Sequence, residues 1–96
     1  MVAEFSSKFS KNGERFDVFV KKAKENKKFK FTLDGRTYVS DEYEIDGVRL
    51  WRIFKNEKDI VPMNIFLSFD EFMEQGIFES LSFPQRFEDM DILEYA

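Results

Sequence analysis

The sequence contains neither cysteine nor histidine. Without cysteine there is no disulfide, no thiolate nucleophile and no cysteine-ligated zinc site. Without histidine the chain lacks the side chain that most often serves as a general base near neutral pH and as a metal ligand. The four glycines all fit turns or helix ends, so no glycine-rich phosphate loop is expected. These absences argue against an enzyme, and we expect no cofactor and no dedicated metal site.

Long hydrophobic runs are also missing. The longest apolar-rich stretch, residues 60–67, contains a proline and an asparagine and is far shorter than the ~20 residues that cross a bilayer. Residues 1–10 lack the apolar stretch of a secretory signal. Because the absence of cysteine also fits a reducing compartment, we expect a cytoplasmic protein without membrane association.

Phenylalanine is abundant, with thirteen among 96 residues. That length suits a single domain, and we expect residues 11–96 to form it and residues 1–10 to be a loosely ordered leader. Burying one phenylalanine contributes ~1.5–3 kcal/mol, so aromatic packing can supply a core without disulfides. A chain this small is not expected to bury all thirteen, which leaves a few for a contact surface.

An amphipathic helix is predicted over residues 13–26. Asn12 is a suitable N-cap, and Asn26 can adopt the left-handed conformation that closes a helix. Lysines fill the last turns, where positive charge is favoured. The apolar residues at helical spacing are Phe16, Phe19, Val20 and Ala23.

Two Asp-Gly pairs, Asp34-Gly35 and Asp46-Gly47, predict tight hairpin turns. The first joins an alternating strand at 28–33 to a return strand that starts at 36, with Phe31 opposite Tyr38. The second leads into a strand from 48 to about 55. Its register sets Ile45 opposite Val48, Tyr43 opposite Leu50 and Glu44 opposite Arg49, so that apolar residues and opposite charges pair.

The last third of the chain predicts one strand and one or two short helices. Residues 60–67 form a fourth strand at a sheet edge or bulge, because Pro62 cannot donate to a ladder. Ser68 begins a helix that Gly76 closes, and Ser82 caps a second helix that continues toward the C-terminus. The fold class is therefore α+β, with an N-terminal helix packed on a three- to four-stranded antiparallel meander and short C-terminal helices.

Charge is divided unevenly along the chain. Residues 1–40 hold ten basic and five acidic residues, whereas residues 41–96 hold five and fourteen. The basic part includes a cluster interleaved with phenylalanines, a pattern that could follow a phosphate backbone and stack bases. Its members are Lys21, Lys22, Lys24, Lys27, Lys28 and Lys30. The simpler interpretation is a solvated helix end beside core residues, since the sequence pI is only about 4.9.

The C-terminal part alternates acidic and large aromatic residues. Such a surface could dock on a basic protein, with the acids steering association and the aromatics acting as anchors. The predicted contact residues are Phe78, Glu79, Phe83, Phe87, Glu88, Asp89 and Asp91. The alternative for the charges is a solvated helix face.

Two carboxylate groups raise the question of other chemistry. Asp41, Glu42, Glu44 and Asp46 could serve a glycosidase, but we expect Glu42 and Glu44 to share the solvated outer face of a strand. The segment 89–94 resembles part of a calcium loop but lacks its glycine and its bidentate glutamate, so we reject a metal site.

Two function classes follow. The first is a small noncatalytic protein-binding module of the inhibitor, immunity, antitoxin or phage-like accessory type, which docks its acidic-aromatic surface on a basic partner. The second is a nucleic-acid-associated accessory protein that uses the lysine cluster. Separately, the strand with Trp51, Ile53 and Phe54 is apolar on both faces, and a homodimer could cover it.

Overall fold

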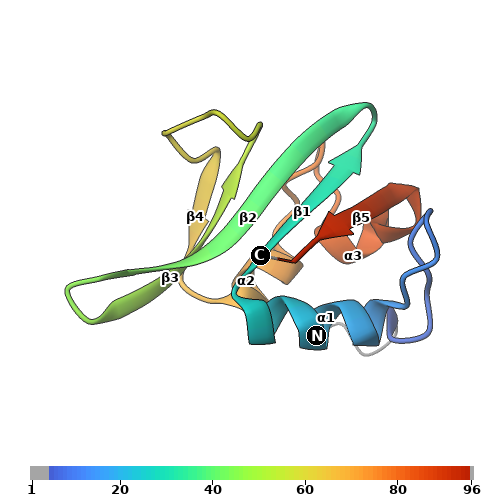
Figure 1. Cartoon of the computed structure of the whole chain (residues 1–96), viewed down its shortest axis with the longest axis horizontal. Helices are drawn as coiled ribbons and strands as arrows, with labels where there is room; N and C mark the ends of the chain where they lie inside the picture. The colour runs from blue at the N-terminus through green and yellow to red at the C-terminus, as the bar shows by residue number, and fades with distance from the viewer. Residues whose placement is uncertain (1–4, 96) are drawn as a thin grey trace.

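The computed structural model describes residues 5–95 and shows an α+β fold (Figure 1). The helices are α1 (Phe16–Asn26), α2 (Phe69–Glu74), α3 (Phe83–Arg86) and the 3-10 turn η2 (Phe87–Asp89). The strands are β1 (Lys28–Leu33), β2 (Arg36–Ile45), β3 (Val48–Phe54), β4 (Asn64–Phe66) and β5 (Met90–Glu94). They form one antiparallel sheet in the order β4-β3-β2-β1-β5.

The three α-helices pack on the same face of this sheet. Phe29 of β1 contacts one ring from each: Phe19 of α1 at 4.8 Å, Phe72 of α2 at 6.2 Å and Phe83 of α3 at 5.8 Å between centroids. All four side chains are fully buried. The aromatic residues therefore form the core, as their abundance predicts. Among the described residues, no helix lies over the opposite sheet face (Figure 1).

Both hairpins match the prediction. Asp34 and Asp46 have φ of 51° and 52°, and the glycine after each also has positive φ, as a primed turn requires. The registers pair Phe31 with Tyr38 and Ile45 with Val48. Short-range turn chemistry was sufficient to place these strands.

The C-terminal segment differs from the prediction, because residues 90–94 form a strand and not the end of a helix. The predicted helix starts with the expected cap, in which Ser82 Oγ accepts from the Gln85 N–H, but α3 ends after four residues. Met90 and Ile92 then alternate into the core opposite Leu33 and Phe31 of β1. The gain is a fifth strand at the edge of the sheet.

The start of α1 also differs. The helix begins at Phe16, and Asn12 does not cap it. Asn12 instead donates to the carbonyl of Ile92 at 2.7 Å and accepts from the N–H of the same residue at 3.0 Å. It thereby occupies the free edge of β5 as a strand neighbour would. At the other end of α1 the left-handed residue is Lys27, with φ of 60°, and not Asn26.

Part of the predicted leader is attached to this domain. The N–H of Phe16 donates to the carbonyl of Lys8 at 2.8 Å, and that of Lys11 donates to Met90 at 2.7 Å. Phe5 packs its ring against Phe16. Residues 1–4, the rest of that leader, lie outside the described residues.

The segment predicted as the fourth strand is shorter than expected. Only β4 pairs with β3, and residues 55–63 form a loop. Helix α2 ends at Glu74, and Gly76 does not close it with a left-handed turn. Gly76 is needed for another reason, since a Cβ there would lie 2.6 Å from the backbone oxygen of Ser80.

Candidate interaction surfaces

The predicted aromatic anchors are core residues, and that part of the sequence prediction is wrong. Phe83 and Phe87 are fully buried, and Phe78 is only 6% exposed. Phe83 stacks on Phe19 at 5.2 Å, and Phe87 meets Phe16 edge-on at 4.9 Å. A partner could not reach these rings without unfolding the C-terminal part of the domain.

Three of the predicted acidic residues, Glu88, Asp89 and Asp91, lie together in an open groove. It has a volume of about 600 Å³ and also contains Asp34, Lys11 and Arg86. Glu79 is absent from its lining and lies in an exposed turn with φ of 52°. The structure therefore brings together three of the four predicted acidic residues. The sequence-based prediction missed Asp34, which comes from the β1–β2 turn.

Basic residues neutralise much of this groove. The guanidinium of Arg86 donates to both carboxylate oxygens of Asp34, at 3.1 and 3.0 Å, and to Asp89 at 3.2 Å. The hydrogen bonds to Asp34 raise the pKa of Arg86 above its ordinary value. Lys8 pairs with Glu88 at 3.3 Å. The groove is consequently a network of ion pairs and holds less free negative charge than its acids suggest.

The lysine cluster is similarly paired. Lys22, Lys24 and Lys27 lie within 4.0 Å of carboxylate oxygens of Glu14, Asp70 and Glu42, respectively. Lys30 has two acidic partners. Only Lys21 and Lys28 make no ion pair with another residue in 5–95. This leaves little free positive charge for a phosphate backbone.

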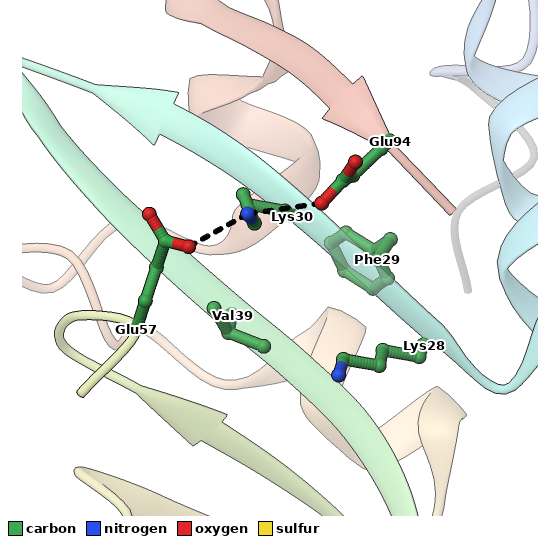
Figure 2. A pocket seen from close by; sticks show the side chains of 6 residues that line it. All are labelled: Lys28, Phe29, Lys30, Val39, Glu57 and Glu94. Carbon is green, nitrogen blue, oxygen red and sulfur yellow. Dashed lines mark hydrogen bonds and ion pairs between the residues drawn. The ribbon is translucent and has the colours of Figure 1, made fainter. Parts of the chain in front are cut away.

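Lys30 lies at the centre of a small pocket on the helix-free face of the sheet (Figure 2). Its Nζ is 2.7 Å from Glu57, in the β3–β4 loop, and 2.9 Å from Glu94 in β5. The hydrogen bond to Glu57, followed by that to Glu94, raises the pKa of Lys30 above its ordinary value. The same bond lowers the pKa of Glu57. The arrangement joins the loop and the last strand to β1, and we assign it a structural role.

This cluster leads to a pH prediction. Because the pKa of Glu57 is lower in the folded chain than its usual 4.5, the ion pair stabilises the fold above that pH. The contribution is lost as the pH falls through the folded-state value. Glu57→Gln should therefore flatten the loss of unfolding free energy below pH 4.5, as measured by urea denaturation across a pH series. The control is Glu25→Gln, since Glu25 makes no ion pair with another described residue. Equal slopes for both variants would contradict the assignment.

The far end of the β2–β3 hairpin, residues 42–50, extends beyond the helices as an arm (Figure 1). Strand alternation sets which side each residue faces. Tyr38 and Ser40 face the core, so Glu42 and Glu44 continue on that same side. The prediction that these two glutamates share the outer face is thus wrong. On β3, Arg49 pairs with Glu44 and lies on the glutamate side as well.

The polarity of the sheet is therefore inverted in the arm. Its outer side, which no helix covers, carries apolar residues where a half-exposed sheet normally has polar ones. Ile65 of β4 lies on the same side, opposite Arg52, and Leu67, two residues further along, continues that side by alternation past the buried Phe66. We call this set the arm face: Tyr43, Ile45, Val48, Leu50, Ile65 and Leu67. Apart from the partly buried Leu50, its members are 39–74% exposed.

The charges bordering the arm face are paired with each other. Arg52 makes a bidentate contact with Asp41 at 2.9 and 2.8 Å. Its guanidinium lies 4.1 Å from the ring centre of Tyr43 and 4.8 Å from that of Phe54. The hydrogen bonds to Asp41 raise the pKa of Arg52 further above its ordinary value. At the end of the arm face nearest the body of the domain, the charges of Asp41 and Arg52 therefore cancel each other.

Comparisons with known proteins identify no relative. No protein-family model, no curated protein and no solved structure matches the chain. Within residues 5–95, no three acidic side chains are grouped so that they could hold a metal ion. The helices in this range are all too short or too polar to span a bilayer.

Proposed function

We propose that this chain is a noncatalytic protein-binding module and that the arm face is its contact surface. The observation that carries the proposal is the inverted polarity of the arm. Five large apolar side chains of the arm face are exposed, four of them on strands, while Glu42, Glu44 and Arg49 occupy the inner side. Contiguous exposed apolar surface of this kind typically marks a protein interaction site.

The inhibitor, immunity, antitoxin and phage-like accessory types named from the sequence are all examples of noncatalytic protein binding, and the proposal does not choose among them. A basic partner remains part of the proposal, and Glu88, Asp89 and Asp91 would form a separate contact surface for it. This acidic groove lies at the other end of β2 from the arm tip, since Asp34-Gly35 precedes β2 and Asp46-Gly47 follows it. Nucleic-acid binding is the weaker alternative, because four of the six lysines in the cluster already have acidic partners.

The test compares two single substitutions of exposed isoleucines. Ile45→Asp places a charge in the arm face, and Ile60→Asp places one in the β3–β4 loop, at the opposite end of β3. Neither side chain is buried, so both variants should fold. Immobilised chains are incubated with lysate of the source organism, treated with nuclease, and the retained proteins are quantified by mass spectrometry. We expect wild type and Ile60→Asp to retain a common protein that Ile45→Asp loses.

Other outcomes overturn specific parts of the proposal. Equal retention by all three chains would exclude the arm face as the contact surface. Loss on Glu88→Lys with Asp89→Lys, but not on Ile45→Asp, would place the contact at the acidic groove. Retention that disappears with nuclease and with Lys21→Glu and Lys28→Glu would favour the nucleic-acid alternative.

A further inference from the structure

We infer that the partner of the arm face is a second copy of this chain, packed face to face in a two-fold symmetric dimer. This inference rests on the proposed function, because it names the occupant of the same surface. A two-fold interface places one patch against itself, so the patch must be self-complementary in charge, area and shape.

Charge is the first condition. The chain carries a net charge of −4, so two copies repel each other over most of their surfaces. The arm face contains no ionisable group except the Tyr43 phenol, and the ion pair that borders it, Asp41 with Arg52, is internally neutral. A second copy can approach here without bringing like charges together. A strongly basic partner, in contrast, would find no free carboxylate on this face.

Area is the second condition. From their exposed fractions, the arm-face side chains present on the order of 500 Å² of apolar surface, at the upper end of what monomers usually leave uncovered. Covering that area on two copies would bury about 1,000 Å², the lower limit for a specific interface. The patch is therefore large enough for a dimer of modest affinity.

The third condition is the fit of the two copies. Packed sheets keep their strands within about 30° of one another. With a two-fold axis near Tyr43, the arm tip of one copy lies over the arm base of the other. Ile45 and Val48 at the tip and the neutral Asp41–Arg52 pair at the base are each two residues from Tyr43 and its partner Leu50. Each tip therefore lies over the ion pair of the other copy, and no unpaired charge is buried.

Sedimentation equilibrium of the full chain between about 1 µM and 1 mM tests the inference, since a minimal interface should dissociate within this range. We expect wild type and Ile60→Asp to form dimers with dissociation constants within about twofold of each other. Ile45→Asp should weaken the dimer at least tenfold, because a two-fold interface buries the new charge twice. Equal dimerisation of Ile45→Asp and wild type would overturn the arm face as the interface.

Failure of this inference is distinguishable from failure of the proposed function. If wild type stays monomeric at about 1 mM, the dimer is wrong. If Ile45→Asp nevertheless loses a protein that wild type and Ile60→Asp retain, the arm face is still a contact surface for another protein. If neither effect occurs, both proposals are wrong.

Discussion

Replacing Phe83 with alanine should lower the free energy of unfolding by about 3–5 kcal/mol. The ring is fully buried and contacts rings from four elements: Phe19 of α1, Phe31 of β1, Phe72 of α2 and Phe87 of η2. No single neighbour can move to fill the cavity, because each is fixed by other ring contacts. Such a loss is a large fraction of the 5–15 kcal/mol that typically stabilises a domain.

Urea denaturation measures this effect, and Leu81→Ala provides the control. Leu81 is two residues away but 41% exposed, so its truncation should cost no more than about 0.5 kcal/mol. A similar small loss for Phe83→Ala, with weakened partner binding, would return Phe83 to the role of anchor that the sequence suggested. The structure predicts the reverse order.

Replacing Ser40 with alanine should cost about 1–3 kcal/mol, although the change removes only one oxygen. Ser40 is the one polar residue of β2 that is fully buried. Its Oγ accepts from Trp51 Nε1 at 2.6 Å and donates to the carbonyl of Arg52 at 2.7 Å. In the alanine variant the buried indole N–H of Trp51 loses its acceptor, and within residues 5–95 no other acceptor is bonded to it.

A double-mutant cycle isolates this hydrogen bond. Trp51→Phe removes the donor, so adding Ser40→Ala in that background should cost clearly less than it does in wild type. Unfolding in urea gives all four free energies. Equal costs in both backgrounds would mean that the effect of Ser40→Ala comes from packing and not from the bond to Trp51.

Local signals explain how much of the fold could be predicted from the sequence. The two Asp-Gly turns fix their hairpins through contacts between residues close in the chain, and both were correct. Strand β5 was missed because Phe83, Phe87 and Met90 fit the spacing of one continuous helix. Its pairing with β1 depends on residues some 60 positions earlier, which no local pattern reveals.

The arm face was missed for a different reason. The alternation of Tyr43 with Ile45 and of Val48 with Leu50 is visible in the sequence, but it does not say which set faces the core. Burial of the polar Ser40 decides this, because Glu42 and Glu44 then follow it onto the inner side. The adjacent apolar residues Leu50 and Trp51 were the available signal, since one of them must face away from the core.

The predicted site was wrong mainly in its aromatic part. Acids and phenylalanines alternate at 83–91 because the phenylalanines complete the core and the acids cover it. The acids do meet in a groove, but Arg86 and Lys8 pair with two of them. The sequence shows how many carboxylates this segment contains but not which basic residues pair with them. Arg86, for example, pairs with Asp34 in a distant turn as well as with Asp89.

Residue-resolved chemical shifts over a dilution series test the arm face most directly. Amide correlation spectra of nitrogen-labelled protein report on the arm, the acidic groove and the lysine cluster in one experiment. We predict that concentration-dependent shifts are confined to residues 41–52 and 65–67. Shifts centred on Asp34 and residues 88–91, or on Lys21 to Lys24, with the arm unchanged would contradict the account.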